Sequence, residues 1–529
     1  MNTEKQELDS RQDAVVTEGR AVDPGVTAPK GLLEKQLNPC AIVIVGASGD
    51  LTARKILPAL FNLYLSGGLP DLFLVIGCGR TELSHDAFRE KMMKAVTKAG
   101  NLDQSKWQSF ARCLFYRSID YHDLPSFTGL AEFLQDLDKK YKTGGNRIFY
   151  LAIPPALYQT VAQMIGRSGL AVEQENSHGW SRLVVEKPFG RDLETAVELD
   201  RSIHENFQEH QIFRIDHYLA KETVQNVLMF RFANSIFEPI WNRRYIEYVS
   251  ITAAEAVGVE HRAGYYEQAG VLRDMFQNHM MQLLAMTAMD PPSLFEADQV
   301  RDEKVRVFRS LRPFPVERLN DYLILGQYGP GSIDGQKAPG YREEPGVSPD
   351  SLIPTFAMIK VFLDNWRWQG VPFFLTSGKR LARKLTEIVI QFKEVPHSMF
   401  RQALEEHIAA NKLILGIYPD EKILLTFQTK NPGAKVCLRS VTMDFNYLQN
   451  YTGPVMEAYE KVLIDCMLGD QMLFWRQDGV ERCWSFLTPI LRECETCGDR
   501  AEMLQPYAAG TWGPRAFQEL KPSKLNDLG

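Results

Sequence analysis

The chain has 529 residues, of which 45% are hydrophobic and 24% are charged. This length exceeds what one hydrophobic core ordinarily supports, so we expect at least two domains, and the composition excludes a fibrous or largely disordered protein. A formal net charge of -6 argues against a nucleic-acid partner or an anionic membrane surface, because both require a basic face.

The N-terminal segment, residues 1–36, is polar and mixes both charges without an apolar period, so we expect a flexible tail. It lacks the apolar core of a secretory signal and contains the acids that mitochondrial signals avoid. No stretch of the chain approaches the roughly 20 apolar residues of a membrane span. We therefore expect a cytoplasmic protein.

Residues 37–215 contain short apolar runs separated by segments of helical length. The runs are Ala41–Gly46, Leu72–Gly77, Arg147–Ile153 and Arg182–Lys187. Continuous apolar strands are typical of burial on both faces, and their alternation with helices predicts parallel βαβ units. We predict an α/β domain with a Rossmann-like, doubly wound parallel sheet.

Residues 216–515 show a different pattern. An amphipathic helix is expected over Gly270–Met289, and strands over Glu247–Ala254, Phe356–Asp364, Thr386–Phe392 and Lys412–Pro419. Several of these strands alternate in polarity, as in a half-covered antiparallel sheet. The pattern predicts a larger α+β domain with a mainly antiparallel sheet and helices, followed by a C-terminal tail over 516–529.

The turn after the first strand contains Gly46 and Gly49, which would let backbone N–H groups approach a pyrophosphate closely. Its spacing is GxxGxL, so the generic GxGxxG fingerprint is only half met, and a turn that simply starts a helix is the alternative. After the second strand Arg80 stands where an acid would favour NAD. Arginine suits a 2'-phosphate, which favours NADP, although a surface charge is the alternative.

Two further clusters could carry chemistry. Arg214 to Lys221, at the inferred domain junction, places Asp216 beside His217, Tyr218 and Lys221, although an ordinary surface patch has the same composition. His279 lies on the apolar face of the expected helix, where a structural histidine is the commoner role. Asp274 and Asn278 would put polar groups beside it.

Together these motifs resemble glucose-6-phosphate dehydrogenase. The resemblance runs from about residue 41 to about residue 514, and RIDHYL is its most specific element. Its motifs are GASGDL from Gly46, Ile153-Pro-Pro155, Glu186-Lys-Pro-Phe-Gly190, RIDHYLAK from Arg214, Arg231-Phe-Ala-Asn234, Ile240-Trp-Asn-Arg243, Arg273-Asp-Met-Phe-Gln-Asn-His279 and Gly370-Val-Pro-Phe373.

The resemblance implies an enzyme that oxidises D-glucose 6-phosphate to 6-phosphoglucono-1,5-lactone with NADP, the first step of the oxidative pentose phosphate pathway. His279 matches the general base, and Asp216 matches the acid that orients it. No metal is implied. Two rivals stay open: a related dehydrogenase of another hexose phosphate, and a non-catalytic sensor of sugar phosphate or NADPH.

The resemblance also assigns binding positions. Substrate positions are Lys187, His217, Tyr218, Lys221, Glu255, Asp274, Lys379 and Lys384. Cofactor positions are Gly46, Ala47, Ser48, Gly49, Asp50, Leu51, Thr52, Ala53, Arg80, Tyr158 and Lys187. The Lys187–Pro188 bond is expected to be cis. The subunits are expected to pair through the large sheet, as a homodimer or a tetramer.

This sequence departs from the family in two places. Ala220 replaces a usual glycine, which is tolerable only where φ is negative. Many animal-type relatives hold a second, structural NADP with a cluster of cations. The corresponding positions here are uncharged: Thr376, Leu385, Val389, Gly416 and Thr426. We therefore predict that the second NADP site is absent or impaired.

Overall fold

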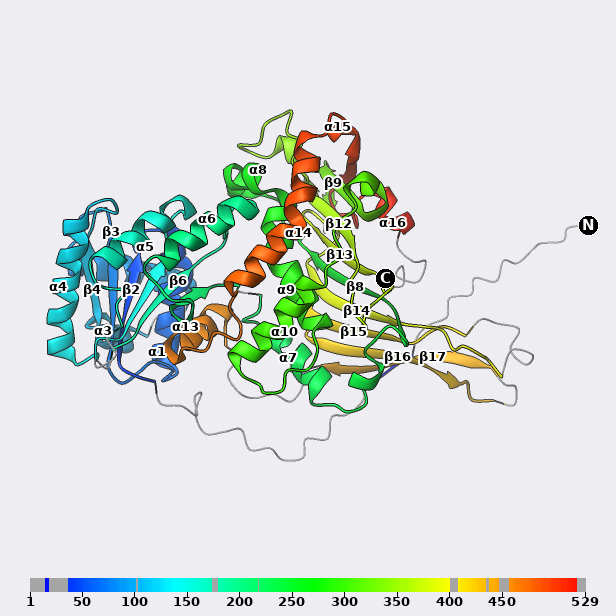
Figure 1. Ribbon diagram of the computed structural model, residues 1–529, viewed down its shortest axis with the longest axis horizontal. Coiled ribbons are helices and arrows are strands. Elements are labelled where there is room, and N and C mark those ends of the chain that lie inside the picture. Colours follow the sequence, from blue (N-terminus) through cyan, green and yellow to red (C-terminus); the bar gives the residue numbers. More distant parts are fainter. Residues whose placement is uncertain are drawn as a thin grey trace, which may run out of the picture.

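We analysed a computed structural model of the chain, which describes residues 15–18, 37–100, 103–173, 179–216, 218–399, 408–433, 437–446 and 456–520. Two large β-sheets lie side by side along its longest axis, with helices between them (Figure 1), and a third sheet has only two strands, β10 (Gly331–Ile333) and β11 (Gln336–Ala338). No helix in these ranges is long and apolar enough to cross a membrane.

The first sheet has six strands, and every neighbouring pair is parallel. Their order is β4 (Leu114–Ser118), β3 (Phe73–Gly79), β2 (Cys40–Val45), β5 (Arg147–Leu151), β6 (Ser181–Val185) and β7 (Ile212–Arg214). Separate buried cores cover its two faces, as expected for strands that are apolar throughout. The predicted Rossmann-like sheet is confirmed.

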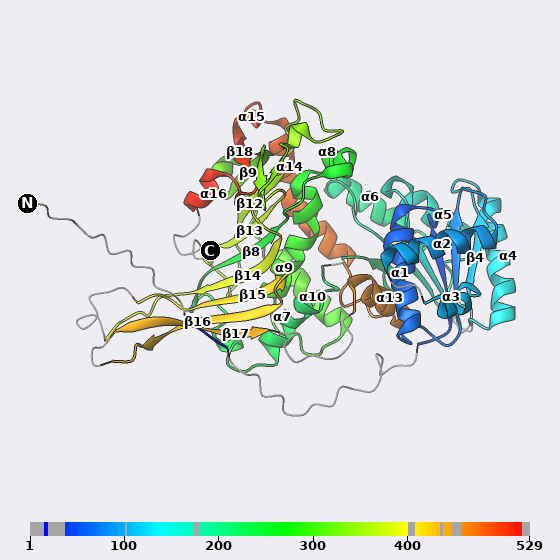
Figure 2. The ribbon, with the colours of Figure 1, turned by 180° about the vertical axis from the view of Figure 1, so that it is seen from behind.

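Helices connect these strands on both sides of the sheet (Figure 2). One core includes α1 (Leu57–Leu65), α2 (His85–Ala99) and α3 (Gln104–Ala111), and the other includes α4 (Leu124–Tyr141), α5 (Tyr158–Arg167) and α6 (Leu193–His204). Asp192 caps α6 through Thr195, and Ser84 caps α2 through Ala87. Helices α2 and α6 are therefore started by a local capping signal, and all six helices bury an apolar face in one of the two cores.

The second sheet has ten strands and is mainly antiparallel, which confirms the predicted fold class. Their order is β1 (Val15–Glu18), β17 (Leu438–Asn446), β16 (Lys422–Lys430), β15 (Lys412–Tyr418), β14 (Leu385–Phe392), β8 (Ile246–Ala254), β13 (Phe373–Gly378), β12 (Phe356–Val361), β9 (Leu323–Gly329) and β18 (Leu504–Ala508). Three pairs are parallel: β8 with β13, β9 with β18, and β1 with β17.

One face of this sheet is covered by helices that lie between it and the first sheet (Figure 1). They are α7 (Glu222–Phe232), α9 (Met281–Ala288), α10 (Ala297–Arg309) and α14 (Gln477–Thr496). The segment that leads into α9 is α8 (Ala263–Val271) followed by a π-helix over Leu272–Met280. The helix expected over Gly270–Met289 is thus present, with a π-helical first half.

Three segments differ from the expected domain organisation. Val15–Glu18, inside the tail predicted to be flexible, forms β1 against β17. Helix α13 (Ala458–Leu468) returns to the first sheet, where Asn62 Nδ2 donates to Glu460 Oε1 at 2.9 Å. Phe517 of α16 (Arg515–Leu520), inside the expected C-terminal tail, packs on Phe356 with ring centroids 5.2 Å apart. The boundary at residue 216 stays a prediction.

Candidate active site

The turn after β2 is built around Gly46, whose φ is 95°. A Cβ at this position would lie 2.2 Å from the carbonyl oxygen of Ala152, so only glycine fits. The N–H groups of Gly46 and Ala47 both donate to Cys78 O, at 2.8 and 2.9 Å. These bonds hold the turn at the carboxyl edge of the sheet.

The rest of the turn is open to a ligand. Ser48, Gly49 and Asp50 are half-buried or exposed, while Thr52 is buried and its Oγ1 donates to Gly46 O at 3.3 Å. Leu51 and Ala53 are partly buried where the helix begins. A turn that requires glycine at Gly46, followed by half-buried and exposed residues at a helix start, fits the diphosphate of a dinucleotide.

Two cationic side chains, Arg80 and Lys91, lie near the carboxyl edge of the first sheet. Arg80 is exposed directly after β3, with its guanidinium 5.8 Å from the ring of Tyr121. Lys91 Nζ, from α2, donates to Ser48 O at 2.9 Å. The sequence did not single out Lys91, because a lysine on an exposed helix face carries no local signal. The pair suits a cofactor that carries phosphate beyond its diphosphate.

His279 and Asp216 lie in contact between the two large sheets, and we call this pair the dyad. His279 Nδ1 lies 2.7 Å from Asp216 Oδ1, and the two residues are only 1% and 2% exposed. Burial lowers the pKa of His279 and the Lys187 ammonium lowers it further, while the Asp216 carboxylate opposes both effects. The imidazole is therefore neutral near pH 7. Since an ionised carboxylate only accepts, Nδ1 carries the proton and Nε2 holds a lone pair.

Lys187 and Tyr218 enclose the other side of the imidazole. Lys187 Nζ lies 3.0 Å from His279 Nε2 and donates to Asp274 O at 3.0 Å. The Tyr218 ring stacks on the imidazole with centroids 4.1 Å apart. The expected cis bond between Lys187 and Pro188 is confirmed. The lone pair of Nε2 thus faces a cation beside a cleft.

Two acids and a lysine extend this group. Lys379 Nζ lies 2.5 Å from Glu255 Oε2 and 3.9 Å from Asp274 Oδ2. Burial alone would raise the pKa of Asp274, but Lys187 and Lys379 outweigh it and hold that pKa well below the ordinary value. Asp274 is therefore a carboxylate. Tyr265 also donates to it, at 3.3 Å.

Two lysines lie against the rings of Tyr218 and Tyr418. Lys221 Nζ is 4.2 Å from the Tyr218 ring centre, and Lys384 Nζ is 4.1 Å from that of Tyr418. Burial lowers the pKa of Lys221 to about 8, and the charge of Lys384 adds to this effect. An anion bound between the two ammonium groups would relieve their repulsion. His217 lies outside the described residues.

Ala220 does not adopt a positive φ, so the alanine that replaces the family's glycine is free of backbone strain. The five positions matched to a second NADP site lie on β13, β14, β15 and β16 of the large sheet. Its absence stays a prediction.

A cleft of about 380 Å³ is lined by seven of the predicted site residues. Its lining includes Leu51, Tyr158, Lys187, Tyr218, Glu255, Asp274 and His279. The other predicted residues that the structure describes do not line it. They are Asp216, Lys221, Lys379, Lys384, Arg80, Gly46, Ala47, Ser48, Gly49, Asp50, Thr52 and Ala53. Asp216 contacts His279, which lines the cleft. A larger cavity, about 900 Å³, runs along the end of β8 past Tyr248 and Phe374, and none of the predicted site residues lines it.

The cleft also contains residues that the sequence did not single out. Tyr459, from α13, donates to Glu186 Oε1 at 3.3 Å, and Tyr150 donates to the same oxygen at 2.5 Å. Burial raises the pKa of Glu186. Glu186 belonged to a quoted motif, but Tyr459 is brought in from 273 residues away and had no local signal.

Comparisons with known proteins agree over most of the chain. Residues 43–226 match the family model of the glucose-6-phosphate dehydrogenase NAD-binding domain, and 228–526 match that of the C-terminal domain. The chain is 48% identical over 481 residues to glucose-6-phosphate 1-dehydrogenase of Aggregatibacter actinomycetemcomitans, covering 91% of this chain and 95% of that one. For the Bacillus subtilis enzyme the identity is 40%, covering 90% and 96%.

Solved structures give the same result. A glucose-6-phosphate dehydrogenase in complex with its substrate glucose-6-phosphate superposes with a TM-score of 0.83 at 35% identity, covering 92% of this chain and 98% of that one. The Mycobacterium avium glucose-6-phosphate 1-dehydrogenase gives 0.77 at 30% identity, covering 92% and 97%.

Proposed function

This chain belongs to the glucose-6-phosphate dehydrogenase family, and from that premise we propose that His279 and Asp216 carry its chemistry. The enzyme oxidises D-glucose 6-phosphate at C1 to 6-phospho-D-glucono-1,5-lactone with NADP. The observation that carries the assignment of roles is the buried contact of 2.7 Å between His279 and Asp216, beside a cleft lined by Lys187 and Asp274.

His279 acts as the general base. Its Nε2 lone pair takes the proton of the C1 hydroxyl. Bound NADP would supply the acceptor for the hydride that leaves C1. Asp216 keeps the proton on Nδ1 and stabilises the imidazolium that forms. Lys187, 3.0 Å from Nε2, keeps that nitrogen unprotonated until the substrate arrives. Its ammonium then donates to the sugar.

The sugar is held at both ends. Lys221 and Lys384 bind the 6-phosphate, which Tyr218 separates from the imidazole. Glu255 and Asp274 accept hydrogen bonds from ring hydroxyls, and Lys379 holds these two carboxylates in place. His217 completes the phosphate site by resemblance. Such contacts, remote from C1, contribute to catalysis by fixing C1 in line for transfer.

The cofactor lies along the carboxyl edge of the first sheet. The turn from Gly46 to Ala53 receives the diphosphate, and Tyr158 and Lys187 line the path toward the dyad. Arg80 binds the 2'-phosphate. Replacing Arg80 with glutamate should shift preference from NADP toward NAD, measured as the ratio of kcat/KM for the two cofactors. An unchanged ratio would mean that the 2'-phosphate is recognised elsewhere.

We further infer a homodimer or tetramer in the cytoplasm, with the subunits pairing through the large sheet. Met443 and Phe445, on its strand β17, are 52% and 45% exposed, which supports a contact there. We also propose one NADP per subunit, without the second, structural site. Sedimentation measures the oligomeric state, and equilibrium dialysis measures the number of NADP molecules bound per subunit. A monomer, or two tightly bound NADP per subunit, would contradict them.

The experiment that tests the reaction is direct. Purified protein is mixed with NADP and glucose 6-phosphate, and the absorbance of reduced nicotinamide is recorded. Galactose 6-phosphate and deoxy analogues, run in parallel, exclude a dehydrogenase of another hexose phosphate if they react far more slowly. Absence of turnover with every sugar phosphate would support the sensor alternative and overturn the proposal.

A further inference from the structure

Arg214 precedes Asp216 by two residues in the chain. It is the last residue of β7, is 4% exposed, and carries two ion pairs. Its Nη2 lies 2.5 Å from Asp200 Oδ1, and its Nη1 lies 2.9 Å from Glu209 Oε1. Charge-assisted bonds of this kind are stronger and more directional than neutral ones. They tie the end of β7 to α6 and to the turn that precedes the strand.

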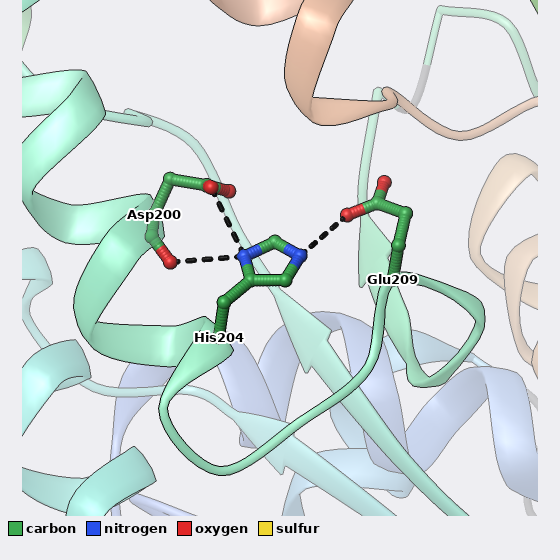
Figure 3. Close-up of side chains that lie close together, drawn as sticks. All are labelled: Asp200, His204 and Glu209. Carbon is green, nitrogen blue, oxygen red and sulfur yellow. Dashed lines mark hydrogen bonds and ion pairs between the residues drawn. The ribbon is translucent and has the colours of Figure 1, made fainter.

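His204 completes this group of charges. Its imidazole lies between the two carboxylates (Figure 3), with Nδ1 3.0 Å from Asp200 Oδ2 and Nε2 3.2 Å from Glu209 Oε2. Asp200 and Glu209 raise the pKa of His204 to about 10. His204 is therefore an imidazolium at neutral pH, and two cations balance two anions.

Asp200, His204 and Glu209 alone would resemble a metal site, since one ligand atom from each lies within 4.8 Å of the others. Arg214 argues against that use. A divalent cation would face the guanidinium and would have to displace the proton of an imidazolium that both carboxylates stabilise. The chemistry of the group is that of an anchor for the strand.

Trp475 connects the end of β7 to the helical segment that contains His279. Trp475 N donates to Arg214 O at 3.0 Å, and Trp475 Nε1 donates to Asn278 Oδ1 at 2.6 Å. Asn278 immediately precedes His279. Arg214 is thus connected forward along the chain to Asp216 and, through Trp475, to the turn of helix that presents His279.

We propose that Arg214, held by Asp200 and Glu209 with His204 as the second cation, is a positioning residue that places Asp216 against His279. The inference rests on the proposed function, because Arg214 acts only through that dyad. A small displacement of Asp216 would weaken its contact with His279 Nδ1. The pKa of His279 would then fall, and His279 would be a weaker base.

Arg214→Lys tests this role, because it keeps the charge but cannot bond both carboxylates with a planar fork. We expect kcat to fall roughly 10- to 100-fold, as for an ångström-scale misplacement. The KM for glucose 6-phosphate should change little. The acidic limb of the pH profile of kcat/KM should move to lower pH, because His279 loses part of the carboxylate's support.

Arg147→Lys is the matched control. Arg147 is a half-buried arginine at the amino end of β5 in the same sheet, where it pairs with Asp138 at 2.9 Å. Arg147→Lys should lower the melting temperature without moving the acidic limb of the kcat/KM profile. If Arg214→Lys does not fold, Glu209→Gln removes one anchor at constant size and should move the limb in the same direction.

His204→Gln tests the charge balance. It should lower the melting temperature at pH 7, and the deficit should shrink as the pH rises toward 10, where the native imidazolium loses its proton. The charged groups that face His204 are Asp200, from its own helix, and Glu209, from the turn before β7. A deficit that does not depend on pH would contradict the imidazolium.

Two results would overturn the inference. One is an acidic limb that stays in place in both Arg214→Lys and Glu209→Gln. The other is a zinc-dependent rise in the melting temperature of the native protein that His204→Gln abolishes, since this would show a metal site. Failure of the proposed function is separate: it would appear as full turnover in His279→Asn, whatever the Arg214 variants do.

Discussion

Replacing Asp216 with asparagine isolates the contribution of the carboxylate to the base. Asp216 Oδ1 is 2.7 Å from His279 Nδ1, and both side chains are buried. For charge centres about 4 Å apart and an effective dielectric constant near 20, the carboxylate stabilises the imidazolium by about 4 kcal/mol. Because each 1.36 kcal/mol is about tenfold in rate, kcat should fall by about three powers of ten.

The amide group of the Asp216→Asn side chain should lower kcat in a second way. If its NH2 group turns toward Nδ1, the proton moves to Nε2, and the base is in the wrong tautomer. Initial rates of NADPH formation at saturating substrate measure the loss. Asp465→Asn is the control, since Asp465 is as buried but bonds Lys461 in α13. A loss of less than tenfold in Asp216→Asn, or an equal loss in the control, would mean that the carboxylate does not stabilise the imidazolium.

Three further predictions follow from the site. Replacing Lys221 and Lys384 together with methionine should raise the KM for glucose 6-phosphate far more than it lowers kcat, in initial-rate measurements; a pure kcat effect would place the phosphate elsewhere. Gly46→Ala should abolish NADPH binding in a fluorescence titration, because its Cβ would lie 2.2 Å from Ala152 O; retained tight binding would contradict the position given to the diphosphate. Lys187→Gln should raise the pKa of His279, because Lys187 now lowers it, so the acidic limb of kcat/KM should move to higher pH; movement to lower pH would show that Lys187 does not act on the base.

Strands β2, β3, β5 and β6 of the first sheet could be predicted from the sequence because each contains a continuous apolar run, whereas the short edge strands β4 and β7 were not predicted. The dyad could be found only through motifs, since Asp216 and His279 are 63 residues apart and nothing local links them. The resemblance also supplied their partners, and the structure places four of these, Lys187, Tyr218, Glu255 and Asp274, in the cleft that His279 lines.

What the sequence did not show depends on long-range packing. Helix α13 returns to the first sheet and brings Tyr459 to Glu186, and Trp475 joins Arg214 to Asn278. Lys91 and His204 lie on ordinary helix faces, where a charged side chain is usually solvated. Only the fold shows that one donates to the turn at Ser48 and the other lies between two carboxylates.

The proposed reaction requires the His279 imidazole to remove the proton from the C1 hydroxyl of glucose 6-phosphate. A crystal structure with glucose 6-phosphate and NADP bound would show whether it can. We expect Nε2 within about 3 Å of the C1 oxygen, with the phosphate between Lys221 and Lys384. A sugar bound with C1 remote from Nε2, and Nε2 still bonded to Lys187, would contradict it.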